Sequence, residues 1–190
     1  MVKKTSLLFI LFIAISAYSE SNEILQIREI YKSAQEFQKA NSDNSIQYVR
    51  YWNENTKDLS NWETLDKNSK KEDILSFIRI FKDHENVSSI LLEESTPSGD
   101  WVHTTEYYFY DNSKIAFVFS NLSTFYGNVR VEKRFYFNES FKIIRELKSI
   151  YDLQTNKELK GRDNDFIDRK VVIVKDAVSV FEKLKLTFSR

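Results

Sequence analysis

The chain has 190 residues, and its 28 basic and 28 acidic side chains give a formal charge of zero. Without an excess of Lys and Arg it lacks the basic surface that binds phosphate backbones, so nucleic acid is not expected as a partner. Hydrophobic residues make up 42% of the chain, with only three Gly and one Pro. This composition excludes a disordered or low-complexity protein and predicts a folded core.

The first nineteen residues have the three parts of a secretory signal peptide. Lys3 and Lys4 form a basic start, an apolar run extends from Leu7 to Ala17, and Ala17 and Ser19 are small residues before a cleavage site. The run is about eleven residues long, whereas a membrane-spanning helix needs roughly twenty. We expect cleavage after Ser19 and no membrane span in the mature chain. An uncleaved membrane anchor is the alternative.

Residues 20–190 are expected to form a single α+β domain that is exported to the periplasm or the exterior. The chain contains no Cys, so it has neither disulfides nor a leader cysteine for a lipid. A chain of this length can bury about 70% of its unfolded surface without disulfides. Export without cysteine favours a bacterial protein. Removal of Lys3 and Lys4 from the 28 basic residues leaves 26 against 28 acidic ones, a formal charge of −2.

A helix is the first predicted element of the mature chain. Its apolar positions recur at helical spacing between Asn22 and Ala40, and Ser21 or Asn22 is the expected N-cap. The range 46–52 is rich in β-branched and aromatic residues and predicts a strand. The polar range 53–67 is expected to be a loop or a short helical turn.

A second helix is predicted to follow. Ser69 and Glu72 form a capping-box pattern, and the stripe behind it consists of Ile74, Phe77, Ile78 and Phe81. His84 would then lie at the C-terminus of this helix, where a cation meets the helix dipole.

Five strands with short connections are predicted after His84. They span residues 86–96, 101–110, 114–123, 128–138 and 141–152, and turn residues such as Pro97-Ser98-Gly99-Asp100 separate them. Connections this short permit only antiparallel neighbours, so the region is predicted to be a β-meander.

The C-terminal region has two interpretations. The β-branched run of residues 170–175 favours an extended segment, and Asp176 could cap a helix that buries Val180, Phe181 and Leu184. A single helix from about Asp165 is the alternative. The fold class is therefore α+β, with an antiparallel meander of about five to six strands and two or three helices packed on one face.

Strand alternation sorts the side chains of the meander into two sets. The first set is almost wholly apolar and is expected to face the helices: Trp101, His103, Tyr107, Phe109, Ile115, Phe117, Phe119, Val129, Val131, Phe135 and Phe137. The second set is mixed: Glu106, Tyr108, Tyr110, Arg130, Glu132, Arg134, Tyr136, Lys142, Glu146 and Lys148. A single β-bulge would exchange part of a set.

Five residues of the second set are the candidate binding residues, and we name them the Tyr/Arg set: Tyr108, Tyr110, Arg130, Arg134 and Tyr136. Tyr and Arg are enriched in binding surfaces because they combine contact area with directional donors. Cross-strand pairs on a solvated face are the favoured interpretation, and a binding surface is the best functional hypothesis.

Few residues offer catalytic or metal-binding chemistry. A ring satisfied within the core is the favoured interpretation of His103, and a role as acid or base is the alternative. The absence of Cys and the scarcity of Gly predict neither a zinc site nor a phosphate-binding loop, so we expect no cofactor or metal. Asp163, Asp165 and Asp168 lack the glycine turn and distal Glu of an EF-hand, which favours a solvated loop.

The aromatic segments of the meander resemble a group of known sequences. Residues 106–111 (EYYFYD), 114–119 (KIAFVF) and 134–137 (RFYF), with Ile144 and Arg145, are similar to small exported bacterial proteins of unknown function. The similarity covers about forty residues and implies an α+β fold and export. It implies no activity.

The sequence favours a non-enzymatic binding or accessory protein of the bacterial cell envelope or exterior. Its partner would be an envelope protein, a peptide or a host macromolecule that contacts the Tyr/Arg set. One alternative is a small pocket enzyme of a cone-shaped α+β fold, in which His103 acts with Glu106 or Tyr107 as acid or base. A structural envelope component is the other.

Overall fold

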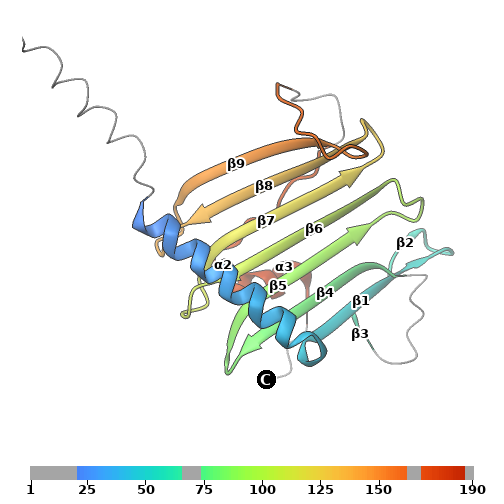
Figure 1. Cartoon of the computed structure of the whole chain (residues 1–190). Coiled ribbons are helices and arrows are strands. Elements are labelled where there is room, and N and C mark those ends of the chain that lie inside the picture. Colours follow the sequence, from blue (N-terminus) through green and yellow to red (C-terminus); the bar gives the residue numbers. More distant parts are fainter. Residues whose placement is uncertain (1–20, 66–73, 162–167, 187–190) are drawn as a thin grey trace, which may run out of the picture.

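The computed structural model describes residues 21–65, 74–161 and 168–186, which form one antiparallel sheet with two α-helices (Figure 1). The helices are α2 (Asn22–Ala40) and α3 (Ala177–Leu184), and a 3₁₀ turn covers Ser42–Asn44. The strands are β1 (Ile46–Asn53), β2 (Asp58–Leu59), β3 (Glu63–Thr64), β4 (Ile74–Asp83), β5 (Asn86–Ser95), β6 (Trp101–Phe109), β7 (Ile115–Thr124), β8 (Val129–Phe137) and β9 (Ile143–Asp152).

The strand order confirms the meander. The strands are arranged β2-β1-β4-β5-β6-β7-β8-β9, with β3 also paired to β1, and every pair is antiparallel. The antiparallel sheet is confirmed, and the described residues are mainly sheet with two α-helices, but the described sheet has nine strands rather than five or six. The additional strands are β4 and the short β2 and β3, which lie where the sequence predicted a helix and a loop.

The second predicted helix is wrong, because Ile74–Asp83 is strand β4. Ile78 and Ile80 are fully buried on one side of this strand, while Phe81 is buried on the other. A strand that is apolar on both sides has apolar residues at the same spacing as a helical stripe. Pairing with β1 and β5 makes this segment a strand. Ser69 and Glu72 lie outside the described residues. His84 is therefore a turn residue between β4 and β5, with a φ of 54°.

Helix α2 is confirmed and lies across one face of the sheet (Figure 1). Ser21 is the N-cap, and its hydroxyl accepts a hydrogen bond from the Ile24 amide at 3.4 Å. Ile24, Ile27 and Ala34 form the buried side of the helix and contact the aromatic side chains of β6, β7 and β8. No helix in the described part of the chain is long and apolar enough to span a membrane.

The C-terminal segment and α3 cover the opposite face, so the helices do not share one face as predicted. Val171, Val174, Val180 and Phe181 pack on a core of residues from β4 to β8. Residues 170–175 form no regular strand, but a single bridge joins Asp176 to Lys114. Asp176 caps α3 by accepting the Ser179 amide at 2.8 Å, as predicted. Each face of the sheet is thus covered by apolar side chains, from α2 on one face and from the C-terminal segment with α3 on the other.

A bulge changes the predicted division of side chains between the faces. Tyr108 pairs with Phe117, whereas Phe109 pairs with Ile115, so Ala116 has no partner across the strands. Phe117 and Phe119 consequently lie on the α2 face with the second set, which corrects the prediction.

The predicted positions in β9 also change. Glu146 pairs with Phe135 and Lys148 pairs with Lys133, so both lie on the face opposite to Arg134. Lys142 precedes the strand and is exposed. The mixed charges of the second set are therefore divided between the two faces.

Candidate functional site

All five residues of the Tyr/Arg set lie on the α2 face. Tyr108, Tyr110 and Tyr136 are 0%, 8% and 5% exposed, because α2 covers this part of the sheet. The Tyr110 hydroxyl donates to the Phe137 carbonyl at 2.7 Å. Arg130 and Arg134 lie farther along β8 and remain about one-third exposed. The tyrosines are thus part of a helix–sheet contact and do not form a solvated face.

Directly beneath α2, aromatic side chains form a row that crosses the strands. Tyr108 pairs with Phe117, and Phe117 pairs with Tyr136. Tyr31 of α2 packs on this row, with its ring centre 4.9 Å from Tyr108 and 5.2 Å from Phe117 in edge-on geometry. Gln38 donates to the Ser89 hydroxyl at 2.9 Å and so fixes the other end of the helix.

Between this row and α2 lies a cavity of about 360 Å³, which we name the α2 cavity. Its walls are mainly aromatic, with two arginines. The lining residues are Ile27, Arg28, Tyr31, Phe117, Phe119, Arg134 and Tyr136. Two members of the Tyr/Arg set, Arg134 and Tyr136, therefore line a cavity.

An arginine pair around one carboxylate gives the cavity a positive side. Arg134 contacts Glu132 at 2.5 Å, and Arg130 contacts the same carboxylate at 3.3 Å. The Arg134 guanidinium also lies 5.3 Å from the centre of the Phe119 ring. Two guanidinium groups thus share one nearly buried carboxylate, and with Arg28 the arginines beside the aromatic walls outnumber the carboxyl groups of Glu132 and Glu106 by three to two.

The hydroxyl groups near the cavity stay protonated at neutral pH. Burial raises the pKa of Tyr31 and of Tyr108, and the neighbouring Glu106 raises both further. The Tyr108 hydroxyl donates to the Glu106 carboxylate, and Gln35 donates to the Tyr31 oxygen at 2.6 Å. Burial also raises the pKa of Glu106, although the bond from Tyr108 opposes that shift. These groups offer hydrogen bonds without phenolate charge.

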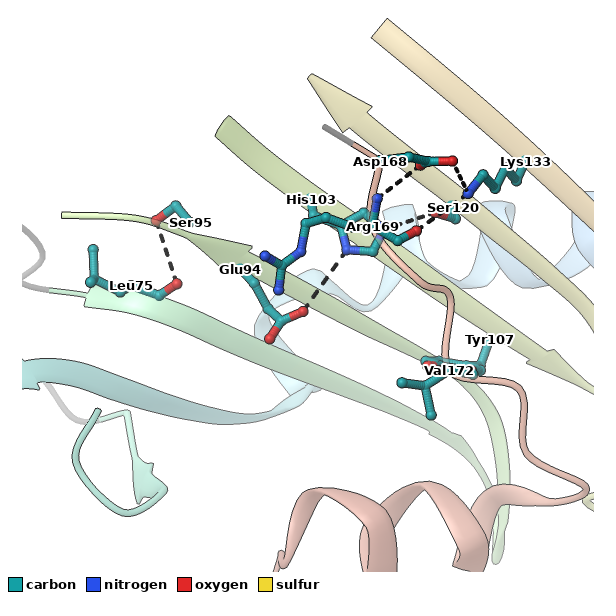
Figure 2. Close-up of polar contacts among 10 residues, drawn as sticks. All are labelled: Leu75, Glu94, Ser95, His103, Tyr107, Ser120, Lys133, Asp168, Arg169 and Val172. Atoms are coloured by element: carbon teal, nitrogen blue, oxygen red, sulfur yellow. Dashed lines mark hydrogen bonds and ion pairs between the residues drawn. The ribbon is translucent and has the colours of Figure 1, made fainter. Parts of the chain in front are cut away.

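A second polar cluster surrounds His103 on the opposite face (Figure 2). His103 Nε2 lies 2.8 Å from the Ser120 hydroxyl, and Nδ1 lies 3.9 Å from the Glu94 carboxylate. Burial lowers the pKa of His103 to about 4, and the positive charges of Arg169 and Lys133 lower it further. The imidazole is therefore neutral at physiological pH.

The residues proposed from the sequence to act with His103 lie elsewhere. Glu106 belongs to the α2 face, while the Tyr107 hydroxyl donates to the Val172 carbonyl at 3.0 Å. His103 and Ser120 are only 3% and 2% exposed, and the chain at Arg169 passes beside them (Figure 2). The pair resembles a base and a nucleophile in distance, but neither group is accessible to a substrate in this conformation.

Of the three acidic residues Asp163, Asp165 and Asp168, the structure describes only Asp168. This carboxylate contacts Lys133 at 2.7 Å, while Asp163 and Asp165 lie outside the described residues. Within the described ranges, no group of three or more His, Cys, Asp or Glu residues is arranged to hold a metal ion.

Sequence reasoning did not identify Arg28, Tyr31, Phe117 or Phe119 as site residues. Tyr31 lies within the predicted helix, but the face of the sheet that this helix contacts was misassigned. The two phenylalanines were placed on the wrong face because the bulge at Ala116 leaves no mark in a single sequence. Comparison with family models, curated proteins and solved structures finds no match to the chain.

Proposed function

We propose that this protein is an exported, non-enzymatic binding protein. It holds a small anion with an apolar ring or alkyl chain in the α2 cavity. The observation that carries this proposal is the combination of aromatic walls with Arg28 and Arg134. Ligand sites in proteins are commonly about 300–1,000 Å³ and combine apolar walls with a few polar groups, and the α2 cavity has this size and lining. Export follows from the leader pattern of residues 1–19.

The lining predicts which ligands bind. Phe117, Phe119 and Tyr136 provide flat apolar area, which favours a ring or an alkyl chain. Arg134 presents a planar group that binds a carboxylate, sulfonate or phosphate through paired hydrogen bonds. Such a ligand would reorganise the Arg134–Glu132 pair, because both anions use the same guanidinium.

Fluorescence titration with 1-anilinonaphthalene-8-sulfonate, an anionic aromatic probe, tests the apolar part of the proposal. We expect saturable binding of one probe per chain. The variant Phe119→Ala removes a cavity wall and should weaken binding about tenfold or more. Phe125→Ala is the matched control, because Phe125 is 71% exposed in the β7–β8 turn. Equal weakening in the two variants would overturn the assignment of the site.

A second pair of variants tests the charge preference. Arg134→Gln should weaken probe binding about tenfold, whereas Lys142→Gln removes the same charge at an exposed position and should change nothing. Circular dichroism and urea unfolding establish that each variant is folded. Unchanged affinity in folded Arg134→Gln would refute the proposal that the cavity selects anions.

The His103–Ser120 pair supports the second candidate, an acid–base enzyme. The 2.8 Å contact has the required length, but the nearly complete burial of both side chains opposes substrate access. Purified protein can be assayed with nitrophenyl esters, and hydrolysis that is lost in Ser120→Ala but retained in Arg134→Gln would support the enzyme. Equal background rates in all three proteins would exclude ester hydrolysis at this pair.

A further inference from the structure

We infer that the α2 cavity is one end of a longer groove along α2, and that this groove binds an elongated molecule with an anionic group at each end. This inference rests on the proposed function and specifies its ligand. It follows from the register of the sheet, from a second hollow beside α2 and from the position of the cations.

The floor of the groove is one continuous row of side chains across five strands. Arg134 pairs with Phe119, and Phe119 pairs with Glu106. Glu106 pairs with Leu91, and Leu91 pairs with Arg79. Residues that pair directly across antiparallel strands share a face, so the row runs without interruption from β8 to β4. It lies two residues along the strands from Tyr108 and its neighbours, which α2 covers.

The wall of the groove is α2. A second hollow of about 630 Å³ lies beside the helix over β4 and β5, and it is lined by residues that include Gln35, Arg79 and Leu91. Gln35 donates to the hydroxyl of Tyr31, which lines the α2 cavity, so the walls of the two hollows are in direct contact. On the floor, Glu106 lies between Leu91 of one hollow and Phe119 of the other. The two hollows are therefore neighbours on both wall and floor.

Cations line both ends of the groove. At the β8 end, Arg28 and Arg134 line the α2 cavity, and Glu132 is the acidic partner of Arg134. On the floor, Arg134 and Arg79 are four strand spacings apart, which is about 19 Å.

At the β4 end, Lys39 and Arg79 line the second hollow together with one acidic residue, Glu36, while Lys32 lines the same hollow one helical turn from Arg28. On the wall, eleven residues separate Arg28 from Lys39, which corresponds to about 16 Å of helix. Floor and wall thus place their cations at similar separations. The ligand should carry its two anionic groups about 16–19 Å apart.

Arg79 has an unused hydrogen-bonding group. Its Nε is buried and has no hydrogen-bond partner in the described part of the chain, although its guanidinium lies 5.3 Å from the centre of the Phe77 ring. Arg79 also lines the second hollow, so the terminal N–H groups of its guanidinium can bind an anion there.

The middle of the groove suits an apolar linker. Phe119 and Leu91 flank Glu106 on the floor. Burial raises the pKa of Glu106, so its carboxyl takes up a proton more readily than an exposed Glu does. The Tyr108 hydroxyl donates to the Glu106 carboxylate, so one oxygen of this group already has a hydrogen-bond partner.

Displacement of the bound sulfonate fluorophore tests the inference with three probes: hexadecanedioate, octanedioate and hexadecanoate. Hexadecanedioate spans the two ends, octanedioate is too short, and hexadecanoate has one anionic group. We expect hexadecanedioate to bind about tenfold more tightly than either of the others, because it gains a second charged contact.

Arg79→Gln should remove the advantage of hexadecanedioate over hexadecanoate. Lys142→Gln, which removes an exposed charge outside the groove, should preserve the advantage. If the fluorophore binds but hexadecanedioate is no better than hexadecanoate, the groove is refuted and the cavity remains. If the fluorophore itself does not saturate, the proposed function fails, and the groove fails with it.

Discussion

The stability of this protein should depend on pH through His103. An unfolded chain binds a proton at this side chain below about pH 6.5, whereas burial lowers the folded pKa to about 4. Between these values the unfolded state binds more protons, so the free energy of unfolding falls as the pH falls. One pKa unit corresponds to about 1.4 kcal/mol, so the full loss is about 3 kcal/mol, of which about 2 kcal/mol appears by pH 5.

Urea unfolding of the wild type and of His103→Gln at about pH 7.5 and pH 5 measures this contribution. The amide of Gln can still contact the Ser120 hydroxyl but does not titrate. Carboxylates, including Glu106 with its raised pKa, change in the same way in both proteins, so the difference isolates His103. The wild type should lose about 2 kcal/mol more than the variant. An identical pH dependence would refute the neutral, desolvated imidazole. His84→Gln, at a side chain 93% exposed, should behave like the wild type.

Two further substitutions test how the helices are held. Ile27→Ala should cost about 2–5 kcal/mol in urea unfolding because Ile27 is fully buried under α2, whereas Leu25→Ala, at a residue 47% exposed, should cost less than about 0.5 kcal/mol. Equal effects would contradict the position of α2. Asp176→Ala should lower the free energy of unfolding by about 1 kcal/mol, because it removes the hydrogen bond that caps α3 at the Ser179 amide. Asp176→Asn should keep most of this stability, because Asn is also a good N-cap. Similar losses in both variants would exclude the capping role.

Local patterns in the sequence were sufficient for α2 and for the five consecutive strands. Apolar residues at helical spacing predicted Asn22–Ala40, and turn residues such as Gly99 and Gly127, both with positive φ, separated the strands correctly. These features depend on neighbouring residues. The strand β4 depends on pairing with β1 and β5, and its apolar residues on both sides satisfied the helical template equally well.

The position of α2 could not be predicted from local patterns. The Tyr/Arg set was correctly placed on one face, but no local pattern indicated that a helix covers it. The aromatic row of Tyr108, Phe117 and Tyr136 exists only because the bulge at Ala116 moves Phe117 to that face. The α2 cavity, which needs both the row and the helix, was therefore beyond the reach of sequence reasoning.

The bulges also explain why α2 lies at one end of the sheet. Register shifts occur after Phe81, Tyr108 and Tyr136, which lie beside α2, and a fourth occurs after Arg50 of β1. Bulges bend a strand and increase its twist, so a line of them bends the sheet along one row. The helix packs beside that bend and covers the aromatic row. The next row of side chains, from Arg79 to Arg134, lies beside the helix and is not covered by it. The β-bulges that position α2 therefore also position the groove.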